Sequence, residues 1–226
     1  MEFKNYTIFG ERHSGTNLLE KVMKSYGLPL TYDLGAGVGP PHFKHWFGHD
    51  MEVIRNNKHT LFIGIVRNPY DWIMAMFKQP HHVKKEITKN FESFVTSEWS
   101  SWHDNFPKGH EYHGKEILRD KNPINGERYS NIFQLRGVKN KYLSNLHKLT
   151  NNCIRVRYED LTNDFDTFFS KPMESFGFKK LDKPEYIHKK ENYPMDYDQV
   201  KLINDGIIWE TENPFGYGKI ELEEEE

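Results

Sequence analysis

Cysteine is nearly absent from this chain of 226 residues, which contains only Cys153. A single cysteine cannot form an internal disulfide, and it excludes a zinc site built from cysteine ligands. No apolar run reaches the roughly 20 residues that a membrane-spanning helix needs, and the N-terminus lacks the apolar core of a signal peptide. We therefore expect a soluble, cytoplasmic protein that does not bind a membrane.

An excess of one sign of charge is also missing, because 31 Lys and Arg residues face 33 Asp and Glu residues. Without a strong basic field, nucleic acid is not expected as the main partner. Aromatic residues make up 15% of the chain, so we expect a core rich in Phe, Tyr and Trp. We predict one domain over residues 1–218 and an acidic C-terminal tail at residues 219–226.

A glycine-bounded loop lies near the N-terminus, at Gly10–Gly15. It follows the apolar run Tyr6–Phe9, a predicted strand, and it precedes a predicted helix with apolar residues at helical spacing: Leu18, Leu19, Val22, Met23 and Tyr26. In such a unit, backbone N–H groups and the helix N-terminus converge on one point, which favours an anion. The alternative is an ordinary strand-to-helix turn, because two glycines at this spacing are a weak signal.

The spacing of these glycines is that of a P-loop, but the residues that follow are Thr16 and Asn17. A nucleoside-triphosphate P-loop has a lysine there for the β- and γ-phosphates, and then a hydroxyl for magnesium. The missing lysine argues against ordinary ATP or GTP hydrolysis and leaves the anion site in place.

The rest of the chain alternates predicted strands and helices. The continuous apolar run Leu61–Val66 is typical of a strand buried on both faces of a parallel sheet, and a helix is predicted at Tyr70–Phe77. This alternation predicts an α/β fold of three layers, with a mostly parallel central sheet and helices on both faces. The other predicted elements are strands at Leu28–Tyr32 and Cys153–Tyr158, helices at Asp50–Arg55, Glu92–Trp102, Tyr129–Leu149 and Asp164–Ser170, and loops at Gly35–Pro41 and Pro107–Glu127.

Polar segments should meet where the parallel strands end, because ligands of open α/β sheets bind there. These segments are the loop Gly10–Asn17, Lys44-His45, and Arg67-Asn68-Pro69. An arginine directly after a buried strand needs either a carboxylate or an anionic ligand. Its position alone leaves both alternatives open.

Three segments, taken together, resemble the sulfotransferase family, which uses 3′-phosphoadenosine 5′-phosphosulfate (PAPS) as sulfonyl donor. They are Arg12-His13-Ser14-Gly15-Thr16-Asn17, Val66-Arg67-Asn68-Pro69-Tyr70-Asp71 and Val156-Arg157-Tyr158-Glu159-Asp160-Leu161. They match, in order, the family's K-S-G-T or K-G-G-T loop, its R-N-P segment and its Y-E-D-L segment. The resemblance covers roughly residues 5–178. It implies a P-loop NTPase-like sulfotransferase architecture and one sulfotransferase-like domain.

The resemblance also implies roles for individual residues. The 5′-phosphosulfate would be cradled by the backbone and hydroxyl groups of Arg12, His13, Ser14, Gly15, Thr16 and Asn17. Arg67 would hold the 3′-phosphate, and Tyr158 would lie near the adenine. His45 lies as far before Arg67 as the family's catalytic histidine lies before its R-N-P arginine, so it is the candidate general base. Lys44 and Arg12 would stabilise charge on the transferring group.

The implied acceptor is a hydroxyl or amine of a small molecule or saccharide, and no metal is expected. The chain departs from the family at His13, which replaces the loop lysine, and at Ala75, which replaces a serine that contacts the 3′-phosphate. It also lacks a C-terminal R-K-G segment. Two alternatives therefore stay open: a P-loop kinase-like phosphotransferase, and a non-catalytic sulfotransferase-like protein that binds a nucleotide or a partner.

Twelve histidines are many for this length, and His42, His45, His49 and Asp50 have the spacing of one helical face. Pro40, Pro41 and Gly48 argue against a continuous helix, so we expect solvated histidines there and no metal.

Three further pairs of residues have predicted places. His81-His82 should lie in a loop, with a role at the acceptor site as the alternative. Glu159-Asp160 should form a structural pair and a helix cap, and Trp99 and Trp102 should belong to the core.

Overall fold

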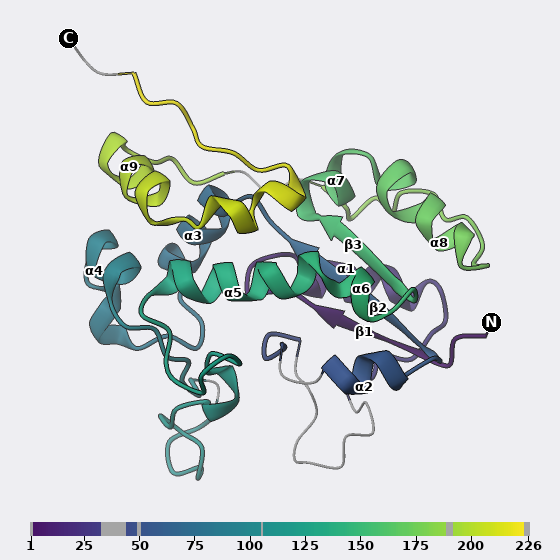
Figure 1. Cartoon of the computed structure of the whole chain (residues 1–226), viewed down its shortest axis with the longest axis horizontal. Coiled ribbons are helices and arrows are strands. Elements are labelled where there is room, and N and C mark those ends of the chain that lie inside the picture. Colours follow the sequence, from purple (N-terminus) through teal and green to yellow (C-terminus); the bar gives the residue numbers. More distant parts are fainter. Residues whose placement is uncertain (1, 33–43, 49–50, 105, 189–191, 224–226) are drawn as a thin grey trace. The chain divides into compact units, whose positions relative to one another are not determined.

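The computed structural model describes residues 2–32, 44–48, 51–104, 106–188 and 192–223 (Figure 1). The predictions for Gly35–Pro41, His42, His49 and Asp50 lie outside these residues. The chain divides into two compact units: residues 1–68 with 142–191, here the first unit, and residues 69–141 with 192–226, here the second unit. The single domain over residues 1–218 stays a prediction. Over the described ranges, no helix combines the length and the apolar character needed to cross a membrane.

The first unit is built on a three-stranded parallel sheet in the order β1-β2-β3 (Figure 1). Its strands are β1 (Asn5–Phe9), β2 (Thr60–Val66) and β3 (Cys153–Arg157). All seven residues of β2 are buried, as expected for the central strand of a covered parallel sheet. The predicted α/β fold with a parallel sheet is thereby confirmed.

Both faces of this sheet are covered by side chains of the first unit. Ile8, Ile63 and Ile154 lie side by side on one face and join a cluster with α1 (Thr16–Lys24), α7 (Tyr158–Asn163) and α8 (Lys171–Ser175). On the other face, Phe9 packs against Phe62, Phe47 and Tyr142. Burial on both faces explains why β2 reads as an almost continuous apolar run, whereas the edge strand β3 alternates, with Ile154 and Val156 buried and Arg155 exposed.

The remaining first-unit elements are α2 (Met51–Asn56), α6 (Leu146–Leu149), the end of α5 (Ile132–Ser144), and a π-helical turn, η3 (Asp166–Ser170). The second unit contains most of α5 and also α3 (Pro69–Lys78), α4 (Phe91–Thr96), α9 (Tyr197–Gly206), and the 3-10 turns η1 (Lys85–Thr88), η2 (Leu118–Asp120), η4 (Trp209–Thr211) and η5 (Asn213–Phe215). Its core includes the fully buried rings of Trp72, Trp99, Phe94 and Tyr129.

Two predicted elements were wrong. Leu28–Tyr32 forms only a single bridge, between Leu30 and Tyr6. The helix predicted for Glu92–Trp102 ends at Thr96, because the next residues pair with another segment: the N–H of Trp99 donates to the Tyr129 carbonyl (2.8 Å). A long-range backbone pairing thus replaces the local helical one.

Other helices differ from the predicted ones in their bounds or their type. The helix predicted for Tyr129–Leu149 begins at Ile132 and breaks at Asn145 into α5 and α6. The helix predicted at Asp164–Ser170 is the π-helical turn η3. Trp99 lies in the core as predicted, whereas Trp102 is half-buried, with the Lys84 ammonium 4.3 Å from its ring centroid.

A buried ion pair joins α5 to the η4 region within the second unit. Arg136 donates from Nε to Glu212 Oε1 (2.6 Å) and from Nη2 to Oε2 (2.8 Å), and the Asn140 amide donates to Oε1 (2.9 Å). Arg136 and Glu212 are 3% and 0% exposed. Because both side chains are shielded from water, their opposite charges are compensated by each other.

Candidate functional site

The glycine-bounded loop joins β1 to α1 in the first unit. A hydrogen bond from the Ser14 N–H to the Glu11 carbonyl (3.1 Å) closes a turn within it. Gly15 has a φ of 98° and occupies the N-cap of α1, whose first turn carries no acidic side chain. The helix N-terminus therefore keeps a field that favours a negative charge.

The space around the two loop glycines leaves no room for a side chain. A Cβ on Gly10 would lie 2.6 Å from Ile65 Cγ2 and 2.7 Å from the Ile65 carbonyl oxygen. A Cβ on Gly15 would lie 2.7 Å from the Tyr158 ring, and the left-handed φ of Gly15 already disfavours other residues. The loop backbone thus packs directly against β2 and the first residue of α7.

Arg67 follows β2 directly and is 5% exposed. Its Nη1 donates to the His13 carbonyl (3.3 Å). Its guanidinium carbon lies 5.1 Å from the centroid of the Tyr158 ring, which is a cation–π distance. The structure thus brings together the glycine-bounded loop, Arg67 and Tyr158, which come from three separate parts of the chain.

The Lys44-His45 segment is fastened to the loop at Gly10. The Gly10 N–H donates to the Lys44 carbonyl (3.0 Å), and His45 Nδ1 lies 2.6 Å from the Gly10 carbonyl oxygen. A carbonyl oxygen only accepts hydrogen bonds, so Nδ1 must carry the proton of this contact. Nε2 is then the basic nitrogen of the neutral His45 ring, as a general base requires.

The two other candidate catalytic cations each contact a carboxylate. Arg12 Nη1 lies 2.9 Å from Glu11 Oε2, and its guanidinium carbon lies 5.6 Å from the Trp46 ring centroid. Lys44 Nζ lies 3.0 Å from Glu20 Oε1 and also donates to the Asn17 side chain. These positive charges are therefore partly compensated before any anion binds.

The Glu20 carboxylate also acts on two nearby tyrosines. Burial raises the pKa of Tyr32, and Glu20, which accepts a hydrogen bond from the Tyr32 hydroxyl (3.0 Å), raises it further. Burial followed by the charge of Glu20 raises the pKa of Tyr6 to about 12. Both phenols therefore stay neutral at physiological pH, and neither one supplies a base.

The Glu159-Asp160 pair has a structural place, but its side chains do not cap α7. That helix has Arg157 at its N-cap and no side-chain cap hydrogen bond. Glu159 instead accepts from the Asn68 N–H (2.8 Å), and Asp160 lies 3.4 Å from the Arg157 guanidinium. Burial raises the pKa of Asp160, while Arg157 opposes this shift.

Sequence reasoning missed Glu11 and Glu20 as parts of this site. Asn17 and Glu20 are three residues apart on α1 and share a face, so their proximity was predictable. Their contact with Lys44 was not, because it spans 24 residues or more of chain. In the second unit, Ala75 is buried in α3, and His81 and His82 lie outside helices and strands, as predicted.

Comparisons of this chain with protein-family models, with curated proteins and with solved structures found no match. The resemblance to sulfotransferases therefore depends on the three motifs and on the contacts among the loop, Arg67 and Tyr158 in the first unit.

Proposed function

We propose that this protein is a sulfotransferase that moves a sulfonyl group from PAPS to a hydroxyl or amine of a small molecule or saccharide. The observation that carries this proposal is the gathering of three other segments, distant in the chain, at the glycine-bounded loop. Arg67 contacts His13, Tyr158 flanks Gly15, and His45 contacts Gly10. The loop and the segments of Arg67 and Tyr158 also carry the family resemblance, and His45 has the family's spacing from Arg67, so these contacts support the proposal.

The proposed donor site uses groups that already face one another. The loop N–H groups and the N-terminus of α1 would bind the 5′-phosphosulfate, with the Ser14 and Thr16 hydroxyls as further donors. Arg67 would bind the 3′-phosphate through its planar guanidinium. Tyr158, whose ring lies against Arg67, would contact the adenine. We propose a P-loop-like sulfotransferase architecture on this basis.

Sulfonyl transfer resembles phosphoryl transfer, in which an in-line displacement spreads charge over the equatorial oxygens and the leaving group. Positioning and electrostatic stabilisation supply most of the catalysis in such reactions. His45 would take the proton from the acceptor through Nε2. Lys44, Arg12 or a protonated His13 would stabilise the charge, in place of the family's loop lysine.

A non-catalytic, nucleotide-binding protein is the second candidate, and one observation favours it. Arg12 already contacts Glu11, and Lys44 already contacts Glu20. Each positive charge is therefore already partly compensated by a carboxylate of the protein. Donor binding without turnover would fit this arrangement. A kinase-like phosphotransferase is less well supported, since the loop lacks the lysine that binds the β- and γ-phosphates.

Calorimetric titration with adenosine 3′,5′-bisphosphate, and separately with ATP and magnesium, tests the proposal. We expect the bisphosphate to bind and ATP with magnesium to bind far more weakly. Preferential binding of ATP would overturn the proposal in favour of a kinase. If the bisphosphate binds, incubation with PAPS and a panel of acceptors separates the two remaining candidates. Donor that binds and is never consumed identifies the non-catalytic protein.

Replacing Arg67 by alanine tests the 3′-phosphate site. The loss of charge-assisted hydrogen bonds of about 1.5–3 kcal/mol should weaken bisphosphate binding by about 10- to 100-fold. Binding of 5′-AMP, which lacks the 3′-phosphate, should change much less. Titration of both ligands measures the difference, and Arg55→Ala is the matched control because Arg55 is exposed on α2. Equal losses for both ligands would remove this role from Arg67.

A further inference from the structure

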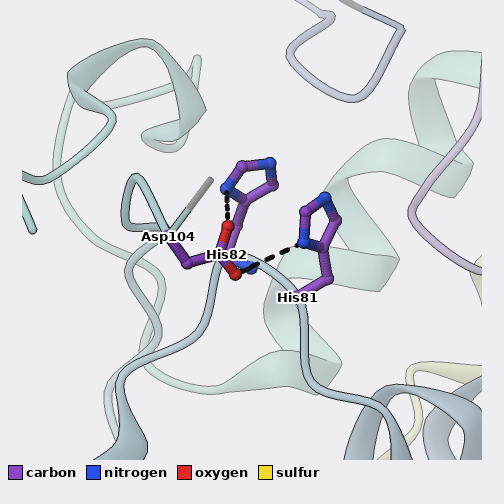
Figure 2. A group of neighbouring side chains, drawn as sticks. All are labelled: His81, His82 and Asp104. Carbon is purple, nitrogen blue, oxygen red and sulfur yellow. Dashed lines mark hydrogen bonds and ion pairs between the residues drawn. The ribbon is translucent and has the colours of Figure 1, made fainter. Parts of the chain in front are cut away.

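Two histidines and an aspartate of the second unit form a cluster that the proposed sulfonyl transfer does not use. His81 Nδ1 lies 3.3 Å from Asp104 Oδ2, and His82 Nδ1 lies 3.0 Å from Asp104 Oδ1 (Figure 2). One ligand atom from each residue lies within 4.8 Å of the others. In Figure 2 both imidazole rings turn toward the carboxylate between them.

Backbone pairing places these residues together. Val83 and Ser101 form an antiparallel bridge, and the Trp102 N–H donates to the His82 carbonyl (3.0 Å). The Asp104 carboxylate also accepts a hydrogen bond from the His82 N–H. Backbone pairing between the segment of His82 and the segment of Trp102 therefore holds the cluster together.

The cluster has a buried side and an open side. The His82 side chain is 4% exposed, whereas those of Asp104 and His81 are 36% and 48% exposed. His82 Nδ1 also lies 2.9 Å from the Trp102 carbonyl oxygen, which fixes the orientation of its ring. Because a carbonyl oxygen only accepts hydrogen bonds, His82 Nδ1 carries the proton of this contact. An ion that enters from solvent on the side of His81 and Asp104 would therefore displace this proton when it binds Nδ1, as metal binding to histidine requires.

We propose that His81, His82 and Asp104 bind a divalent transition-metal ion, with Zn²⁺ as the best fit. Imidazole nitrogen and carboxylate oxygen are common zinc ligands, whereas Ca²⁺ and Mg²⁺ prefer oxygen ligands throughout. Ligand atoms about 2.1 Å from a tetrahedral ion lie about 3.4 Å from one another, close to the two observed nitrogen–oxygen distances. Three protein ligands leave one position for water.

This proposal differs from the expectation from the sequence that no metal binds. The sequence places His81-His82 in a loop but does not connect the pair with Asp104, which lies 22 residues after His82. Spacing alone could not reveal this, because the antiparallel pairing of the two segments brings the aspartate back to the histidines. The inference is independent of the proposed sulfotransferase activity.

Titration of the full chain with ZnCl₂ by calorimetry tests the proposal in the absence of any nucleotide. We expect His81→Ala and Asp104→Asn each to weaken one zinc-binding event by at least about 10-fold, the lower limit for disturbing even the outer shell of a metal site. His59→Ala, which removes an exposed histidine of the first unit, should leave that event unchanged. Both ligand variants avoid His82, whose burial and φ of 59° make it a poor site for substitution.

Thermal unfolding with and without ZnCl₂ gives a second measurement. Because an ion that binds only the folded state stabilises it, zinc should raise the unfolding temperature of the wild type and of His59→Ala more than that of His81→Ala. If zinc does not bind the wild type, or if it binds and stabilises His81→Ala and Asp104→Asn equally well, the proposal is wrong.

Discussion

Replacing His45 by alanine should lower the turnover of PAPS with an acceptor by about 10²- to 10⁴-fold, the usual contribution of a general base. The contact between Nδ1 and the Gly10 carbonyl makes Nε2 the basic nitrogen, so the variant loses the group that would take the acceptor's proton. The measurement is the steady-state rate with an acceptor that the wild type turns over. Bisphosphate affinity, measured by titration, should change little.

Two further variants separate proton acceptance from anchoring of the loop. In His45→Gln, the new side-chain amide can still donate a hydrogen bond to the Gly10 carbonyl but cannot act as a base. This variant should therefore retain bisphosphate binding and lose turnover. His59→Ala is the control for removing an exposed histidine of the same unit. Turnover of His45→Gln at the wild-type rate would place the base on another residue.

The central strand of the first unit was predictable because it is buried on both faces. Such strands read as uninterrupted apolar runs, and β2 fits this pattern from Leu61 to Val66. The order of strands and helices then gave the α/β class. The positions of the loop and of Arg67 followed, since polar residues after parallel strands gather at one edge of the sheet.

The second unit was harder to predict because backbone pairing there competes with helix formation. Trp99 fits the helical pattern that begins at Phe91, yet it pairs with Tyr129, 30 residues away. The helix α9 was not predicted at all, although Asp196 and Gln199 form a capping box at its start. That local signal was present in the sequence and was overlooked.

Charge compensation in the candidate site could not be deduced from the sequence. The motifs indicated which cations would face an anion, but they assign no role to the carboxylates of Glu11 and Glu20, which contact Arg12 and Lys44. A cation that must first leave a carboxylate binds an anion less strongly, because the ligand replaces one favourable contact with another. In the proposed reaction, binding of the donor would therefore depend on whether Glu11 and Glu20 move aside.

Replacing Glu212 by glutamine should lower the free energy of unfolding by about 3–5 kcal/mol, the usual cost of removing one partner of a buried ion pair. The Glu212 side chain accepts three hydrogen bonds from Arg136 and Asn140, and it is fully buried. Glutamine keeps the shape and removes the charge that compensates Arg136. Urea unfolding followed by circular dichroism measures the change.

The matched control is Glu210→Gln, since Glu210 is an exposed carboxylate two residues before Glu212, in the 3-10 turn η4 that Glu212 follows. It should change the free energy of unfolding by less than about 0.5 kcal/mol, as surface substitutions do. A double variant, Arg136→Met with Glu212→Leu, removes both charges together and should recover much of the lost stability, because apolar replacements of a buried ion pair are often neutral. If Glu212→Gln unfolds like Glu210→Gln, the pair contributes specificity to the fold but little stability.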